Sequence, residues 1–194
     1  MPREQSLKLL ISEIEKIYPL SKSMSNALEE HVQERTIPRR ATLLYEGGSQ
    51  NSLWFIIRGF AREYQNSGVD WSESTNWFWQ ALDFVFHEAY FSEARSDVSI
   101  DFYTDALILE IDFLGLLKIP AIENEAAEFR NALIVRFESD RRNYLHDLAN
   151  LPKMDHVRKF YYAHKYLFNF VRHRDLASFL RIKDKSIYRY LKKL

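Results

Sequence analysis

Residues 176–191, LASFLRIKDKSIYRYL, decide the fold of the C-terminal part of this 194-residue chain. Their apolar positions fit two short helices joined by a tight turn, which is the pattern of a helix-turn-helix. Leu176 and Leu180 are four residues apart and share the inner face of the first helix, where the small Ala177 lets the second helix approach. Ile187 closes this core from the second helix. The segment therefore predicts a C-terminal helix-turn-helix.

The second of these helices has a cationic outer face. At about 100° per residue, Lys185 and Arg189 point outward when Ile187 points inward. A helix with such a face suits the major groove of duplex DNA. The alternative is a packed helical end whose charges serve solubility. We predict DNA contacts at Asp184, Lys185, Ser186, Tyr188, Arg189, Lys192, Lys193, Arg172 and Arg174.

Charge is distributed unevenly along the chain, although its net charge at pH 7 is zero. The tail from Pro152 to Leu194 contains twelve Lys or Arg and three Asp, a net charge of +9 that leaves −9 for the remainder. A basic module attracts a polyanion because its contacts with phosphates release counterions. This partition favours double-stranded DNA as the partner of the tail.

Composition excludes several classes of function. The chain has no cysteine, which excludes disulfides, thiolate catalysis and cysteine-bound zinc or iron–sulfur clusters. No apolar run is long enough to span a bilayer, and the first fifteen residues lack the apolar core of a signal peptide. With 46% hydrophobic residues, the chain can still bury a substantial core. We therefore expect a cytoplasmic protein without a membrane partner.

The first 120 residues combine two helices with many short strands. Apolar spacing predicts helices over Gln5–Tyr18 and Ser25–Gln33. From Thr36 onward, short apolar and aromatic runs alternate with turn signals, which is typical of a β-barrel or jelly roll. The expected strands are Ala41–Tyr45, Leu53–Ile57, Phe60–Tyr64, Ser74–Trp79, Val98–Tyr103 and Leu107–Ile111.

A long helix is expected from about Glu123 to Leu151, because this stretch contains no Gly or Pro and Pro152 follows it. Asp140 and Arg141 interrupt its apolar stripe. We predict that the stripe forms a dimer contact, and the alternative is that the helix packs only on its own barrel. The stripe residues are Phe129, Leu133, Phe137, Tyr144 and Leu148, and a further helix is expected over Met154–Phe168.

Taken together, three blocks resemble the Crp/Fnr family of regulators with a cyclic-nucleotide-binding domain. They are the strand block Leu43–Gly48 with Leu53–Tyr64, the long helix, and Leu176–Leu180, in that order. The resemblance implies an α+β fold with a jelly-roll (double-stranded β-helix) sensor domain over 1–120. A dimerisation helix over 121–151 and a helix-turn-helix domain over 152–194, without the family's wing, would follow. The implied function is a homodimeric, DNA-binding transcription regulator that also contacts RNA polymerase.

Carried over from the family, the base-contacting positions are Asp184, Lys185 and Arg189. The fork of Arg189 suits the O6 and N7 atoms of guanine. Arg181 stands where the family has a turn glycine, so we expect either a distorted turn or a left-handed residue there. Lys183 replaces the usual Ser or Thr cap, which leaves Asp184 as a substitute cap or a base reader. These departures predict a changed operator.

The stretch Asp83–Ser96 matches the family's phosphate-binding cassette poorly. Glu88 and Arg95 would supply its acid and its cation, but His87 replaces its glycine and aromatic residues crowd the segment. We therefore expect no tight binding of cyclic AMP and no cofactor; the effector would be apolar, or the barrel would be plugged. The residues of this expected effector pocket are Glu88, Arg95, Trp77, Trp79, Phe86 and Tyr90.

Two other classes of function compete with DNA binding. The first is a sensor or assembly module whose helix-turn-helix has degenerated, and Arg181 and Asp184 favour it. The second is an enzyme on a cupin-like barrel, which needs metal ligands. The six histidines show no metal-ligand spacing, and no catalytic motif stands out, so we expect neither a metal nor an enzyme.

Overall fold

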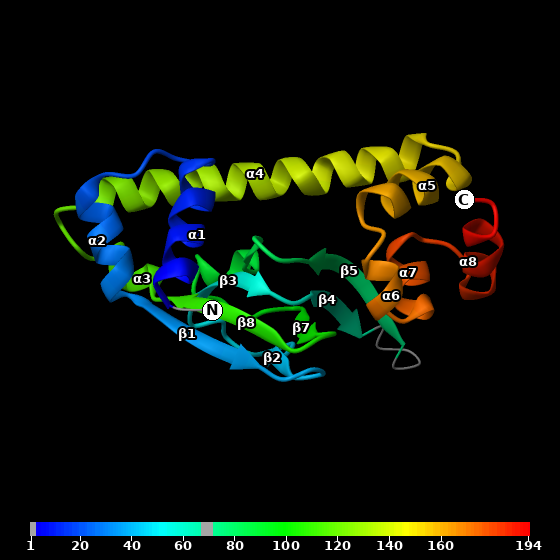
Figure 1. Cartoon of the computed structure of the whole chain (residues 1–194), viewed down its shortest axis with the longest axis horizontal. Helices are drawn as coiled ribbons and strands as arrows, with labels where there is room; N and C mark the ends of the chain where they lie inside the picture. Colours follow the sequence, from blue (N-terminus) through cyan, green and yellow to red (C-terminus); the bar gives the residue numbers. More distant parts are fainter. Residues whose placement is uncertain (1–2, 67–71) are drawn as a thin grey trace.

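The computed structural model describes residues 3–66 and 72–194. Figure 1 shows the strands beside one long helix, α4, which runs from α1, α2 and α3 at one end of the molecule to α5, α6, α7 and α8 at the other. The helices are α1 (Arg3–Glu15), α2 (Lys22–Glu30), α3 (Phe113–Leu116), α4 (Glu123–Asn150), α5 (Lys153–Ala163), α6 (Leu167–Phe170), α7 (His173–Phe179) and α8 (Asp184–Leu191).

The strands form two antiparallel four-stranded sheets, in the orders β1-β8-β3-β6 and β2-β7-β4-β5. This arrangement confirms the expected jelly-roll domain followed by a helical C-terminal domain. The strands are β1 (Val32–Ile37), β2 (Thr42–Leu44), β3 (Leu53–Arg58), β4 (Ala61–Asn66), β5 (Glu73–Trp79), β6 (Phe84–Val85), β7 (Ser99–Phe102) and β8 (Ala106–Ile111), and a 3-10 turn, η1 (Glu88–Tyr90), follows β6.

The barrel core comes from strands that are buried on both faces. Residues Leu53 to Ile57 of β3 are all buried, which explains why this stretch is continuously apolar rather than alternating. Gly59 follows β3 with a φ of +118°, and a Cβ atom there would lie 2.6 Å from Ala106 Cβ. Glycine is therefore required where β3 turns into β4 against the start of β8.

Helix α4 packs its apolar stripe on its own chain. Phe129 is fully buried against Phe84 and Phe113, and Leu133 is 4% exposed. Phe137 stacks on Trp79 with ring centroids 5.0 Å apart. The assignment of Phe129 and Leu133 to a dimer contact is therefore wrong, because the barrel already covers both side chains.

The far end of α4 packs on the helix-turn-helix. Tyr144 stacks on Phe179 of α7 with centroids 4.4 Å apart, and its hydroxyl donates a hydrogen bond to the Phe179 carbonyl. Leu148 is half-buried and lines a cavity beside Arg181. Tyr144 therefore also packs within its own chain and does not form the expected dimer contact.

The helix boundaries near Pro152 are partly as expected. Helix α4 ends at Asn150, and Leu151 is extended, as the residue before a proline usually is. The single helix expected over Met154–Phe168 is instead two, because α5 ends at a turn around His164 and α6 begins at Leu167.

Candidate DNA-binding surface and effector pocket

The helix-turn-helix forms as its apolar pattern predicted. Leu176, Ala177, Leu180 and Ile187 are each at most 1% exposed and join one core with Val157 and Leu167 of the preceding helices. The tail from α5 to α8 therefore shares one hydrophobic core, to which Phe78 of β5 also contributes.

The turn between α7 and α8 is built on a left-handed residue. Arg181 has a φ of +52°, which confirms one of the two conformations expected where the family has glycine. Its N–H donates to the Ser178 carbonyl at 3.1 Å, and the Ile182 N–H donates to the Ala177 carbonyl at 3.0 Å. This pair of bonds is a Schellman motif, which satisfies the last carbonyls of α7.

The outer face of α8 is exposed and cationic. Lys185 and Arg189 are exposed, as are Lys192 and Lys193 just beyond them, and Tyr188 is 60% exposed. The apolar side of the helix, through Ile187, docks on α7. The structure thus brings most of the expected DNA-contacting residues onto one accessible surface.

Asp184 and Ser186 contribute less to that surface than the cations of α8 do. The N-cap position of α8 is Lys183, which makes no side-chain cap bond, so the alternative of Asp184 as a substitute cap is wrong. Asp184 is exposed in the first helical turn, where a negative charge favours the helix dipole. Ser186 is half-buried and accepts a hydrogen bond from Arg189 Nη2 at 3.4 Å.

Arg172 and Arg174 face acidic groups instead of standing free. Arg172 Nε donates to Asp175 Oδ2 at 2.6 Å, and its Nη2 lies 3.5 Å from Glu73 Oε2. Arg174 Nη2 lies 3.7 Å from the same Glu73 atom. Both side chains remain about half exposed (51% and 57%). Barrel and helix carboxylates thus already partner both arginines, and their expected contacts with DNA stay a prediction.

A buried charge cluster joins the helix-turn-helix to the barrel. Arg62 of β4 and Asp175 of α7 are 1% and 2% exposed, and their charged groups lie 3.2 Å apart. Arg62 also pairs with Asp101 at 2.9 Å and with Glu73 at 2.8 Å, while the Tyr103 hydroxyl donates to Asp175. Burial acts to lower the pKa of Arg62, but the hydrogen bond and charge of Asp101 with the charges of Tyr103 and Asp175 outweigh it and raise the pKa.

This cluster is not among the sites expected from the sequence, although the sequence contains two signals of it. Arg62 lies inside the apolar strand block, and Asp175 is one of three acids in a tail with twelve cations. A charge inside an apolar run is rarely buried without a partner, so the two residues were candidates for one pair. The backbone N–H of Thr75 on β5 also donates to Ser178 Oγ at 3.0 Å, in the same junction.

The expected effector pocket does not assemble as a phosphate site. Arg95 is exposed, and its Nη1 donates to the Gly47 carbonyl. Glu88 lies elsewhere, at a cavity of about 240 Å³ that Arg95 does not line. Phe86 and Tyr90 are 2% and 1% exposed and belong to the core, so they plug the barrel.

The barrel cavity beside Glu88 is acidic. Among the described lining residues Arg141 is the one Arg or Lys, and it donates to both carboxylate oxygens of Glu63 at 2.7 Å. Burial raises the pKa of Glu63, and Arg141 opposes that rise. His87 pairs with Asp97 at 3.0 Å. Arg141 interrupts the apolar stripe of α4 because it turns into the barrel to meet a buried acid; that interruption was the signal in the sequence.

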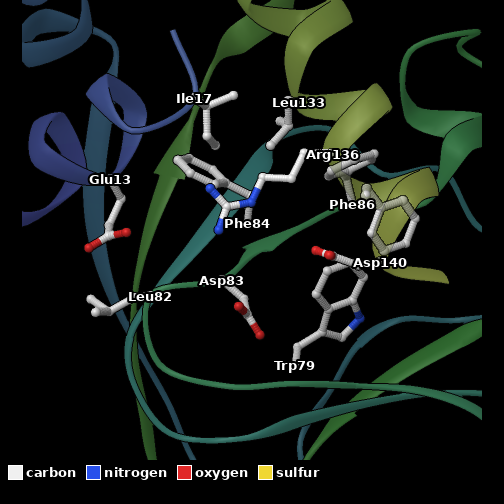
Figure 2. Close-up of a pocket in the computed structure, with 11 residues that line it drawn as sticks. Glu13, Ile17, Trp79, Leu82, Asp83, Phe84, Phe86, Leu133, Arg136 and Asp140 are labelled. Atoms are coloured by element: carbon white, nitrogen blue, oxygen red, sulfur yellow. The ribbon is translucent and has the colours of Figure 1, made fainter. Parts of the chain in front are cut away.

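A smaller cavity of about 70 Å³ lies between α1, β6 and α4 (Figure 2). Figure 2 shows the carboxylates of Asp83 and Asp140 beside the indole of Trp79, with Arg136 between them and Ile17. Burial raises the pKa of Asp83 to about 7. The volume suits a few water molecules and not a nucleotide.

Residues 3–66 and 72–194 contain neither a metal-binding cluster nor a membrane-spanning helix. In these ranges no group of three or more His, Cys, Asp or Glu is placed to hold a metal ion. None of the helices described above is long and apolar enough to cross a membrane.

Comparison with known proteins shows a likeness to solved structures. No family model matches the chain, and no curated protein matches it. FixK2 from Bradyrhizobium japonicum superimposes with a TM-score of 0.71 at 14% identity, covering 84% of each chain. The c-di-GMP-responsive regulator CLP from Xanthomonas campestris gives 0.65 at 18% identity, covering 87% of this chain and 88% of that one.

A protein assigned to the Crp/Fnr family of transcriptional regulators from Eubacterium rectale gives a TM-score of 0.68 at 17% identity. It covers 90% of this chain and 83% of its own. At identities this low, the TM-scores show a shared fold alone, and the function has to be argued from the residues. The chain has the fold of Crp/Fnr family regulators and cyclic-nucleotide-binding-domain proteins.

Proposed function

We propose that this chain is a DNA-binding transcription regulator of the Crp/Fnr type, which acts as a homodimer in the cytoplasm, contacts RNA polymerase and has no enzymatic activity. The observation that carries the proposal is the division of α8 into two faces. Ile187 is buried on α7, while Lys185 and Arg189 are exposed on the opposite side. A helix anchored in this way can enter the major groove without losing its own core.

Each cation on this surface would have a distinct role. Arg189 would read guanine, because its planar fork donates two parallel hydrogen bonds to O6 and N7. Lys185 would contact a neighbouring base. Lys192 and Lys193, at the end of α8, would pair with phosphates and add affinity without sequence preference.

The direct test is a titration of fluorescent random-sequence duplex DNA by anisotropy, between about 50 and 200 mM salt. We expect binding that weakens steeply as salt rises, because phosphate contacts release counterions. The exposed Lys118, at the opposite end of the barrel, supplies the control variant Lys118→Ala. Absence of binding at micromolar protein, or binding that ignores salt, would contradict the proposal.

Sequence preference is tested on a protein-binding DNA array. Arg189→Ala and Lys185→Ala should each relax preference at one base pair, at a cost of about 1 to 3 kcal/mol. Lys193→Ala should weaken binding to all sequences alike. Equal losses on every sequence for all three variants would remove the assignment of base contacts to Lys185 and Arg189.

We also propose that cyclic AMP is not the effector. The barrel cavity is lined by Glu63, Glu88, Asp97 and Glu138, and its Arg141 is already held by Glu63. A cyclic phosphate entering it would face these carboxylates, and the described part of the lining offers it no free Lys or Arg. Calorimetric titration should detect no binding in the micromolar range, and micromolar affinity or better would overturn this part of the proposal.

A second candidate function is an assembly module that acts through protein contacts. The ion pairs of Arg172 and Arg174 with Glu73 and Asp175 favour it, since they turn two cations toward the barrel. The anisotropy titration separates the two candidates, because only the regulator binds duplex DNA.

A further inference from the structure

A second, larger cavity lies where the barrel meets the helical tail. It has a volume of about 420 Å³ and is bounded by β5, α4, α5, α6 and α7. This volume falls in the range that small-molecule sites occupy. It is separate from the acidic barrel cavity around Glu63 and Glu88. Much of its wall is aromatic, from Trp77, Trp79, Phe137, Tyr144, Phe160 and Phe179.

Three buried nitrogen atoms belong to residues of this lining and have no hydrogen-bond partner within the part of the chain that the structure describes. They are Trp79 Nε1, His156 Nε2 and His164 Nδ1. Trp79 and His156 are each 3% exposed. Buried polar atoms in folded proteins are nearly always paired, since an unpaired one loses its hydration without compensation. Three such atoms on side chains that line one cavity are groups that a ligand with polar atoms of its own would satisfy.

The chemistry of these nitrogens limits the class of ligand that the cavity can bind. The indole of Trp79 can only donate. Burial lowers the pKa of both His156 and His164, which keeps the two imidazoles neutral at pH 7 with one donor and one acceptor nitrogen each. The site therefore offers the indole of Trp79, which can only donate a hydrogen bond, and two neutral imidazoles, each of which can donate or accept one. It carries no imidazolium charge.

The charges of the lining disfavour an anion. Three carboxylates, Asp83, Asp140 and Asp147, belong to it. Of the described lining residues only Lys159 is a Lys or Arg, and its Nζ already lies 2.6 Å from Asp147 Oδ2. An anionic ligand would meet acidic groups without a free cation to balance it.

We propose that this junction cavity binds a neutral, planar heteroaromatic small molecule whose ring acceptor atom takes a hydrogen bond from Trp79 Nε1. The aromatic wall supplies apolar contact and ring stacking. Because the wall includes Trp77 and Trp79 of β5 as well as Phe179 of α7, the bound molecule touches the barrel and the helix-turn-helix at once. Binding of the small molecule depends on these contacts alone and does not require that the chain bind DNA.

The test uses three aromatic probes with ¹⁵N-labelled full-length protein. Quinoline is neutral with one ring acceptor, naphthalene has the same shape without it, and quinoline-2-carboxylate adds a negative charge. Indole N–H signals are followed by NMR, and the Trp79→Phe variant assigns that of Trp79. Quinoline should shift the Trp79 signal saturably and bind about fivefold tighter than naphthalene, which is the usual effect of one neutral hydrogen bond. The carboxylate should bind more weakly than quinoline.

Two variants separate the site from general effects on folding. Trp79→Phe keeps the stack on Phe137 but removes the donor, so calorimetry should find quinoline and naphthalene binding equally. Trp54→Phe is the control, because Trp54 is buried in the barrel core outside this cavity. It should keep the fivefold preference.

A third variant fills the cavity from its rim. Ala163 lines the cavity at the end of α5 and is exposed, so Ala163→Trp adds bulk without cutting into a core. It should abolish quinoline binding, whereas Ala149→Trp, on exposed α4 surface outside the cavity, should not. The proposal is overturned if millimolar quinoline leaves the Trp79 signal in place, or if Ala163→Trp binds quinoline as well as the wild type. Neither readout involves DNA, so failure here is distinct from failure of DNA binding.

Discussion

At the scale of single residues, Arg181 occupies a left-handed position in the turn between α7 and α8. The helix-turn-helix pattern places a turn at this position, where glycine is the residue that adopts a positive φ without cost. The structure keeps the turn and its φ of +52° with an arginine. Arg181 Nη1 donates to Ser74 Oγ at 3.0 Å, a contact across the domain junction that the local sequence does not encode.

Arg181 yields a prediction about stability. Arg181→Gly should raise the free energy of unfolding by about 1 kcal/mol relative to Arg181→Ala, because glycine alone relieves the left-handed backbone. The alanine variant is the matched control, since both variants lose the contact with Ser74. Urea denaturation of the two variants measures the difference, and a more stable alanine variant would contradict the assigned strain.

Asp83 yields a prediction about pH. Its folded pKa of about 7 lies above the unfolded value near 3.8, so the folded protein binds the extra proton between these values. The stability that Asp83 contributes is therefore fully present below about pH 3.8 and is lost as pH rises through 7. Asp83→Asn removes this titration and should make the protein more stable than wild type at pH 8, by up to about 4 kcal/mol.

Urea denaturation at pH 4 and at pH 8 checks the sign. The advantage of Asp83→Asn should vanish at pH 4, where the native carboxyl is protonated as well. An advantage of the same size at both pH values would mean that the amide improves packing, and that the buried charge is not the cause.

At the scale of elements, α4 shows the limit of periodicity. The spacing of Phe129, Leu133 and Phe137 correctly identifies one buried face, yet periodicity does not say what buries it. The barrel provides that cover through Phe84, Phe113 and Trp79. An apolar stripe on a helix between two domains is thus equally compatible with packing on its own barrel and with packing on a second copy of the chain. Only the tertiary structure distinguishes these two cases.

The outward side of α4 supplies the dimer prediction instead. Val135 and Leu145 are 69% and 59% exposed, and they are ten residues apart, the spacing of a and d positions in a coiled coil. Figure 1 shows α4 along one edge of the molecule, where a second copy has access to it. Replacing both residues with glutamate should weaken the proposed homodimer at least about tenfold, because each glutamate would meet its own copy.

Analytical ultracentrifugation over a range of concentrations measures this change. The control is Tyr45→Glu, since Tyr45 is 65% exposed but lies after β2, away from α4. If the double variant stays as dimeric as the control, the dimer is formed by another surface.

At the scale of the whole molecule, the order of the domains along the chain can be predicted from the sequence. The way in which these domains pack against one another cannot. Strand signals, a long uninterrupted helix and a basic helical tail each have local patterns, so jelly roll, α4 and helix-turn-helix could be predicted in order. The junction depends on Arg62 meeting Asp175 across 113 positions of the chain, and on Phe78 of β5 entering the core of the tail. Pairings at this separation leave no periodic trace in a single sequence.

This docking predicts how the acidic body restrains the basic tail. Glu73 on β5 contacts Arg172 and Arg174 of the helix-turn-helix, so Glu73→Gln should loosen both cations, which Asp175 continues to partner, and let them approach phosphates more readily. Affinity for random duplex DNA should rise about two- to threefold, and the dependence on salt should become steeper by up to about one released counterion. The control is Glu110→Gln, which makes the same change of net charge at the Arg35 pair on β8. Anisotropy titrations at several salt concentrations compare the two variants; equal gains would show that long-range charge alone is responsible, and that contact with Glu73 does not restrain the arginines.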